Sequence, residues 1–260
     1  MHEIAALISS ERLGKFLAIT GTERDALTLH LRAMQTAAAL MPVTGLIEIA
    51  LRNAACERLR VHFNVPDWLS NPPRPFRWKG SEANNIKKGI GQAQKAAYAK
   101  KGQADKRALD VIAYPNGIPA GISHERRSKA RQKVLQITAG DLISQLTMFF
   151  WKRLFSSDYE ATLWKPSLKK LFPNKTLDRS EIAGHLEVIY VARNRIAHHE
   201  PVMGQRLQDT LGSIDFISAN FASNEPTADN ALTKLLAPYR NVLAREADEL
   251  SDLLGRFTLS

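Results

Sequence analysis

Apolar residues recur every three or four positions along much of the chain. This spacing matches the turn of an α-helix and places the apolar side chains on one face. Residues 23–40 and 44–63 both show the pattern, with Thr22 at the N-cap position of the first segment and Pro42 between the two. We therefore predict two helices that are interrupted at Pro42, the second of them a core helix.

The next part of the chain is polar and contains many helix-breaking residues. Residues 64–80 hold four prolines, which remove backbone donors and predict a loop. Residues 81–101 and 123–135 have the pattern of polar, basic helices. Between them, residues 113–121 contain two prolines and an Asn-Gly pair, which predict a connection rich in turns.

The last part of the chain returns to apolar helical periodicity. Residues 138–155 predict a strongly apolar helix, and residues 177–200 predict a long helix that Pro201 ends. Two further helices are expected at about 205–221 and 229–256.

No segment shows the alternation of apolar and polar residues that is typical of a strand. The pattern therefore predicts an all-α protein with a single domain over residues 1–260. We expect this domain to be a helical bundle that carries a basic, mainly helical insertion at residues 66–133.

The positive charge is concentrated in one segment. The chain has a formal net charge of +10, and the segment from Arg77 to Lys133 contains fourteen basic and four acidic residues. This excess, beside aromatic residues of the preceding loop, predicts binding to RNA through phosphate contacts and base stacking. The predicted RNA-binding residues are Arg77, Trp78, Lys87, Lys88, Arg126, Arg127 and Arg131. A solvated surface that only keeps the protein soluble is the alternative.

Other classes of protein are disfavoured. Cys56 is the only cysteine, which excludes an internal disulfide and a cysteine-rich zinc site, and we expect it to be a core thiol. The histidines lack ligand partners at metal-binding spacing, so we predict no metal and no cofactor. No run of 18 apolar residues occurs and the first residues carry charges throughout, so we expect a soluble, cytoplasmic protein without a membrane partner.

Residues 192–201, ARNRIAHHEP, concentrate polar chemistry at the end of a predicted helix. Asn194 and His198 are four residues apart and share a face, as do Arg195 and His199. The negative end of the helix dipole favours a protonated histidine there, which can donate a proton near neutral pH.

These residue types are sufficient for RNA cleavage without a metal. In that reaction the ribose 2′-OH attacks the adjacent phosphate, a base and an acid move protons, and an arginine neutralises the developing charge. Histidines and arginines are also common capping and surface residues at helix ends, so a purely structural role stays open.

The motif resembles that of the HEPN superfamily, in which an arginine followed by a polar residue precedes a histidine by a short helical interval. Arg193, Asn194 and His198 fit that pattern. Four longer stretches are similar to Abi-like (abortive infection) proteins of bacteria, and the resemblance covers about two thirds of the chain. These stretches are residues 45–59, 140–155, 163–173 and 187–202.

The resemblance implies a HEPN-type bundle with metal-independent endoribonuclease activity, acting in phage defence or as a toxin. It implies a homodimer in which two motifs face each other, with Arg193 and His198 as the catalytic pair and Asn194 as the positioning residue. An antitoxin, either protein or RNA, is a further possible partner. The alternatives are a non-catalytic RNA-binding module and a helical interaction protein.

Further residues are candidates for lining the site. Glu48, Arg52 and Asn53 match polar positions that recur in Abi-like proteins. Glu48 and Arg52 are also four apart, in the order that favours an ion pair within one helix. If they are buried instead, they need partners, which the motif helix can supply. His199 and Arg195 either contact RNA or face solvent.

Overall fold

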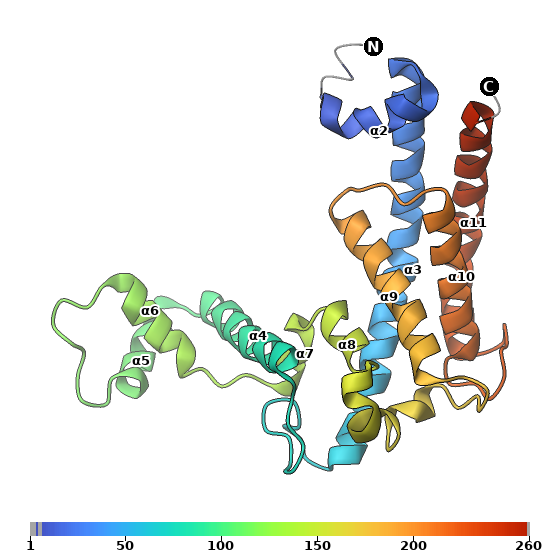
Figure 1. Cartoon of the computed structure of the whole chain (residues 1–260). Coiled ribbons are helices and arrows are strands. Elements are labelled where there is room, and N and C mark those ends of the chain that lie inside the picture. Colours follow the sequence, from blue (N-terminus) through green and yellow to red (C-terminus); the bar gives the residue numbers. More distant parts are fainter. Residues whose placement is uncertain (1–3, 5–6, 259–260) are drawn as a thin grey trace. The chain divides into compact units, whose positions relative to one another are not determined.

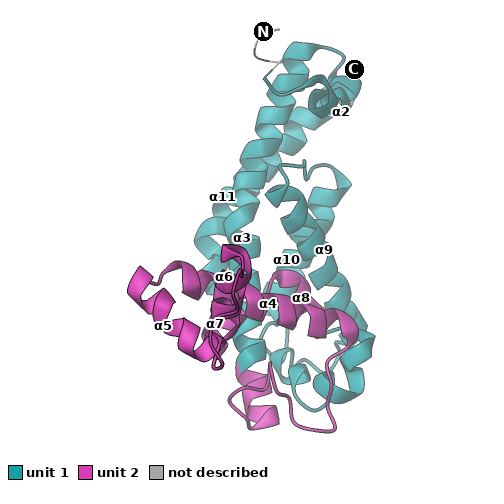
Figure 2. Cartoon of the chain, turned by 90° about the vertical axis from the view of Figure 1, so that its left-hand side faces the viewer, with its two compact units in different colours: residues 1–56, 155–260 teal, residues 57–154 magenta. Residues whose placement is uncertain are grey.

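The computed structural model describes residue 4 and residues 7–258, and in it the protein is all-α (Figure 1). No strand occurs among these residues, which confirms the predicted class. The chain divides into two compact units (Figure 2). Unit 1 comprises residues 1–56 and 155–260, and unit 2 comprises residues 57–154. The segment 66–133 lies wholly within unit 2, and His2 lies outside the described residues.

Unit 1 is built from long helices and a group of short turns. Its elements are α2 (Ser10–Thr20), most of α3 (Glu23–Phe63), η1 (Ser157–Tyr159), the π-helix η2 (Glu160–Trp164), η3 (Leu168–Leu171), α9 (Arg179–Ala197), α10 (Gln205–Asn220) and α11 (Ala231–Thr258). Helices α9 and α10 pack against each other as a hairpin (Figure 1). Asp178 caps α9, because its Oδ1 accepts the backbone N–H of Glu181 at 2.8 Å.

Helix α3 is continuous through Pro42, so the predicted interruption there is wrong. A proline inside a helix leaves the carbonyl four residues earlier without its usual donor. The cost is offset by burial on both sides of it, since Leu40, Val43 and Ile47 are at most 1% exposed. The N-cap prediction is confirmed, because Thr22 Oγ1 accepts the backbone N–H at the start of the helix.

By length and composition alone, α3 is apolar enough to cross a membrane, and it is the one helix of the described chain that meets this test. The core helix of a soluble protein meets the same test, and 44% of the apolar window is buried inside the protein. The absence of a membrane partner stays a prediction.

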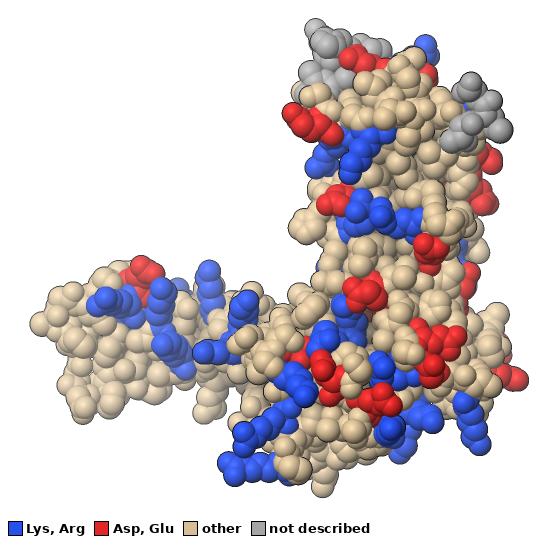
Figure 3. Space-filling view, viewed as in Figure 1, with Lys and Arg blue, Asp and Glu red and all other residues tan. Residues whose placement is uncertain are grey.

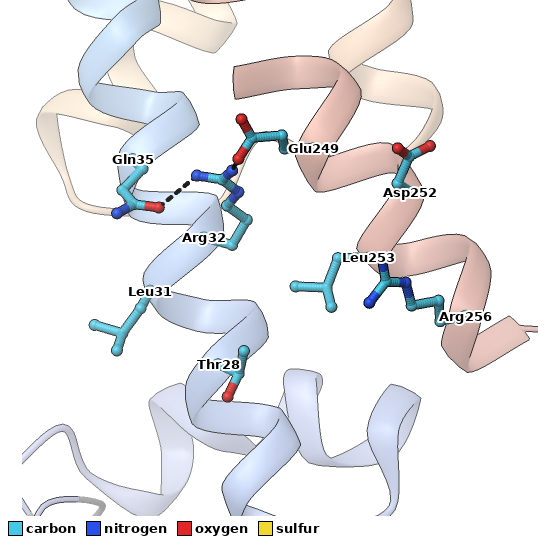
Figure 4. A pocket seen from close by; sticks show the side chains of 8 residues that line it. All are labelled: Thr28, Leu31, Arg32, Gln35, Glu249, Asp252, Leu253 and Arg256. Atoms are coloured by element: carbon cyan, nitrogen blue, oxygen red, sulfur yellow. Dashed lines mark hydrogen bonds and ion pairs between the residues drawn. The ribbon is translucent and has the colours of Figure 1, made fainter. Parts of the chain in front are cut away.

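A groove of about 420 Å³ lies between α3 and α11 of unit 1 (Figure 4). Arg32 crosses it: its Nη1 donates to Glu246 at 2.9 Å and to Gln35 at 2.7 Å, and its Nη2 pairs with Glu249. The groove is therefore bridged by an ion-pair network that joins the two helices, and no residue of the 193–199 cluster lines it.

His30 of α3 is buried without a hydrogen bond to its Nδ1 from any described residue, and its ring lies edge-on to Phe16 at 5.0 Å. Burial, and then the charge of Arg12, lower the pKa of His30 below its ordinary value of 6.5. The unfolded chain therefore binds a proton more readily than the fold does, and the free energy of unfolding falls as the pH drops below about 6.5.

We expect the melting temperature to decrease between pH 7.5 and pH 5, and the decrease to be smaller in His30→Leu. The half-buried His185 should account for part of the remainder, because burial also lowers its pKa. Melting curves of both proteins across this range check the expectation, and equal pH dependence would contradict it.

Unit 2 contains the end of α3 and five further helices. These are α4 (Gly80–Ala99), α5 (Gln103–Ala113), α6 (His124–Lys133), α7 (Ala139–Gln145) and α8 (Met148–Arg153). The prediction of one helix over 138–155 is wrong, because Leu146 adopts an extended conformation between α7 and α8. The break leaves the Leu146 carbonyl free to accept the buried indole N–H of Trp151 at 3.2 Å.

A buried ion pair joins α4 to α8 within unit 2. Glu82 is fully buried, its Oε1 accepts Arg153 Nε at 3.0 Å, and Ser81 Oγ donates to it at 2.6 Å. Removing one partner of a buried ion pair costs roughly 3–5 kcal/mol. We expect Arg153→Met to lower the stability of unit 2 by about 3 kcal/mol, near the lower bound because Arg153 keeps 26% of its side chain exposed.

The double variant Glu82→Gln/Arg153→Met removes both charges and should recover part of the loss. Urea unfolding followed by tryptophan fluorescence checks both results. A double variant less stable than Arg153→Met would show that the buried carboxylate is not the cause.

Candidate functional site

The candidate site lies at the C-terminal end of α9 in unit 1. The helix ends at Ala197, and not at Glu200 before Pro201 as the sequence predicted. His198 is the C-cap residue, and His199 has a φ of 55° in the left-handed region. The last turn therefore closes before the two histidines, and both are displayed on an exposed corner of the chain.

Backbone hydrogen bonds account for this corner. The amide of His199 donates to the Ile196 carbonyl at 3.0 Å, and the amide of Glu200 donates to the Arg195 carbonyl at 2.7 Å. These two bonds form a Schellman motif, in which the left-handed position is usually a glycine. Arg12 of α2 also donates from Nη1 to the His199 carbonyl at 3.2 Å. Nothing in the sequence near the motif pointed to Arg12, since the contact spans 187 residues.

The left-handed backbone of His199 gives a stability prediction. A non-glycine residue pays about 1 kcal/mol or more for this conformation, and glycine pays far less. We expect His199→Gly to raise the free energy of unfolding by about 0.5–1 kcal/mol and the branched His199→Val to lower it. Chemical denaturation of the two variants checks the opposite signs, and equal destabilisation would contradict this account of the corner.

Arg193 is anchored by a carboxylate of the core helix. Its Nε lies 3.2 Å from Glu48 Oε2 of α3, and Glu48 is 13% exposed while Arg193 is 34% exposed. Glu48 therefore pairs with the motif helix, and the alternative pair with Arg52 does not form. Arg52 instead donates from Nε to Asn53 Oδ1 at 3.4 Å on an exposed surface.

Arg195 supports the shape of the helix end. Its Nε donates to the Pro201 carbonyl at 3.2 Å, and its Nη1 pairs with Glu200 at 2.9 Å. The side chain thus links the last turn of α9 to the segment that leaves it. The sequence left the roles of Arg195 and His199 open. Arg195 has a structural role. The described contacts of His199 are made by its backbone and not by its ring.

The cluster combines a paired cation with accessible polar groups. Arg193 pairs with Glu48, while His198 is exposed and Asn194 is half-buried. Among the described residues, neither Nη group of Arg193 donates to a protein acceptor, so both can bind an anion. The guanidinium can therefore bind a phosphate, and the imidazole of His198 is accessible at the end of the same helix.

Metal and thiol chemistry find no support at this site. Within the described part of the chain, no three histidine, cysteine or carboxylate side chains are grouped to hold a metal ion. Burial raises the pKa of the Cys56 thiol to about 12, which keeps it protonated and a poor nucleophile. The absence of a metal and of a cofactor stays a prediction.

The predicted RNA-binding residues of unit 2 fall into two groups. Arg77, Lys87, Lys88 and Arg126 are exposed. Arg131 is buried and is not a surface residue: its Nε donates to Asp110 Oδ1 of α5 at 2.7 Å.

Arg127 also donates to Asp110 Oδ1, at 3.1 Å. The hydrogen bonds from Arg131 and then Arg127 hold the pKa of Asp110 well below its usual range. This pairing replaces the predicted RNA contact of Arg131 with a structural role and engages Arg127 in the same cluster. The sequence did not reveal Asp110 as their partner.

Trp78 also has a structural role, and its predicted base stacking stays a prediction. Its indole Nε1 donates to the Leu69 carbonyl at 2.9 Å, and its ring packs at 4.9 Å from Phe76, 6.1 Å from Trp68 and 5.6 Å from Phe150. The aromatic residues of the proline-rich loop therefore pack in one cluster of unit 2, in which Trp68 is buried and Phe76 and Trp78 are half-buried.

The chain matches no protein-family model, no curated protein and no solved structure.

Proposed function

We propose that this protein is a metal-independent endoribonuclease in which Arg193 and His198 carry the reaction. The observation that carries the proposal is the ion pair of Arg193 with the half-buried Glu48, together with an exposed His198 at the end of the same helix. An arginine that can stabilise the charge on a phosphoryl group and an accessible histidine that can transfer a proton are the two groups that this chemistry needs.

The proposed step conserves every atom and proton. The ribose 2′-oxygen loses its proton to a base and forms a bond to the adjacent phosphorus. The bond from phosphorus to the 5′-oxygen breaks, and an acid protonates that oxygen as it leaves. The products are a 2′,3′-cyclic phosphate and a 5′-hydroxyl, with no oxidant, metal or cofactor involved.

Each residue of the cluster has a defined part in this step. His198 exchanges a proton with one of the two oxygens. Arg193 stabilises the negative charge on the phosphoryl oxygens through its Nη groups. Asn194, whose side chain precedes His198 by one helical turn, orients the RNA or the imidazole. Glu48 is a positioning residue, because its carboxylate pairs with the guanidinium, 3.2 Å from its Nε.

A single motif supplies one histidine for a reaction that needs both an acid and a base. We therefore propose a homodimer in which the second motif provides the other group, as the resemblance to HEPN proteins implies. The same resemblance supports a HEPN-type bundle, a role in abortive infection or as a toxin, a cytoplasmic location and control by an antitoxin. We further propose that the basic segment 77–133 binds the RNA.

The experiment is incubation of the purified protein with total RNA in excess EDTA, beside Arg193→Ala/His198→Ala. We expect the wild type alone to shorten the RNA, and the mass of the protein in solution to be that of a dimer. RNA that is bound in a gel but stays intact would favour the non-catalytic RNA-binding module. Cleavage that persists in the double variant would place the reaction elsewhere.

A further inference from the structure

Helix α6 of unit 2 carries basic residues on two opposite faces. The inner face holds Arg127 and Arg131, both of which are neutralised by Asp110. The other face holds Arg126, Lys129 and Lys133, at the three- and four-residue spacing that aligns side chains along a helix. All three are exposed. The inner pair therefore fixes the helix, and the outer row is left for an anion.

A second exposed row runs along α4. Asn84, Lys88, Gln92 and Lys95 follow one another at spacings of four, four and three residues and are all exposed. The row extends over roughly 16 Å at 1.5 Å per residue. It alternates amides, which both donate and accept hydrogen bonds, with ammonium groups that bind phosphate.

Within the described chain, no carboxylate forms an ion pair with Lys88, Lys95, Arg126 or Lys133. Lys129 does have a partner, the equally exposed Glu125 at 2.7 Å. Unit 2 has nineteen basic and seven acidic residues, and Figure 3 shows lysine and arginine side chains spread over it with little acidic surface between them. The rows thus lie in a positive field that attracts a polyanion.

The surface of unit 2 displays no exposed Trp, Phe or Tyr side chain. Proteins that bind single-stranded RNA stack its bases on aromatic side chains beside a basic groove. Every Trp, Phe and Tyr of unit 2 is buried or half-buried, and the tryptophans of its loop belong to the aromatic core. The charge is therefore available for the backbone of RNA, while no Trp, Phe or Tyr ring is fully displayed for its bases.

We propose that unit 2 binds double-helical RNA through its sugar–phosphate backbone. This inference rests on the proposed function insofar as that function makes RNA the substrate. A duplex displays phosphates and 2′-hydroxyls across a wide, shallow minor groove, and proteins recognise it there by shape. The ammonium groups of α4 and α6 bind the phosphates. The amides of Asn84 and Gln92 bind the 2′-hydroxyl groups, which DNA lacks.

The experiment measures binding separately from cleavage. Full-length Arg193→Ala/His198→Ala protein is titrated with a labelled 20-base-pair RNA duplex, with one strand of that duplex, and with the DNA duplex of the same sequence. We expect the RNA duplex to bind roughly tenfold more tightly than the single strand and more tightly than the DNA. A single strand bound as tightly as the duplex would overturn the proposal, and DNA bound equally would overturn the role of the 2′-hydroxyls.

The variant Arg126→Gln/Lys129→Gln/Lys133→Gln, made on the same background, tests the location. We expect it to weaken duplex binding and to reduce the salt slope of log Kobs by about 2–3, near 0.9 for each lost phosphate contact. The matched control is Lys169→Gln/Lys170→Gln/Lys175→Gln, which removes three exposed charges from unit 1. Equal losses in the two variants would show a general charge effect and would overturn the assignment to α6.

The two proposals fail in different ways. Duplex binding without any cleavage by the wild type would leave the role of unit 2 standing and remove the ribonuclease. Cleavage by the wild type without a preference for duplex RNA would leave the ribonuclease standing and remove the proposed role of unit 2.

Discussion

Replacing His198 by alanine is expected to lower the rate of RNA cleavage about 10²–10⁴-fold, the usual contribution of a positioned acid or base. Affinity for RNA should be almost unchanged, because His198 is exposed and the described contacts at the end of α9 are made by its backbone. Single-turnover cleavage of a labelled RNA gives the rate, and a binding titration of the same RNA gives the affinity.

His199→Gly is the matched control for this variant. It removes an equally exposed neighbouring imidazole and keeps the left-handed corner. We expect it to cleave at the wild-type rate. A large loss in His199→Gly with little loss in His198→Ala would show that His199, and not His198, transfers the proton. That result would contradict the proposed site.

The second large effect is expected for Arg193→Ala, which removes the group that stabilises the charge of the transition state. Loss of one such preorganised donor costs about 10²–10³-fold in rate. Glu48→Gln should have a smaller effect in the same direction, because an amide holds the guanidinium less firmly than the carboxylate 3.2 Å from its Nε. Single-turnover rates of both variants, at saturating protein, check this order.

Arg256→Ala provides a charge-matched comparison, since Arg256 is an exposed arginine that lines the groove between α3 and α11 and not the motif. It should leave the rate unchanged. If Glu48→Gln were more harmful than Arg193→Ala, the carboxylate itself would take part in the reaction, and its assignment as a positioning residue would be wrong.

Local patterns predicted most of the helices. Apolar spacing and prolines located α4, α6, α9 and α10 to within a few residues, because these signals depend on neighbours along the chain. The errors arose where packing outweighed a local signal. Pro42 lies inside a continuous helix because the residues on both sides of it are buried. Leu146 interrupts the predicted helix over 138–155, and its carbonyl accepts the indole N–H of Trp151.

The residues of the candidate site were predictable only in part. The motif was identified by its resemblance to HEPN proteins, and a buried Glu48 was expected to find a partner on the motif helix. Pairs of residues that are distant in the sequence could not be predicted from local patterns. Asp110 lies 21 residues from Arg131, and nothing in a single sequence distinguishes an arginine that it binds from one that faces RNA. Trp78 shows the same limit for aromatic residues, whose burial depends on the whole unit.

The central claim is that the 2′-hydroxyl attacks the phosphate without a metal. A defined RNA that the protein cuts at one site can be compared with the same RNA carrying a single 2′-deoxynucleotide on the 5′ side of that site, both in excess EDTA. We predict that the all-ribose RNA gives a 2′,3′-cyclic phosphate and a 5′-hydroxyl, and that the substituted RNA is not cut there. Cleavage of the substituted RNA, or products with a 3′-hydroxyl and a 5′-phosphate, would contradict the mechanism.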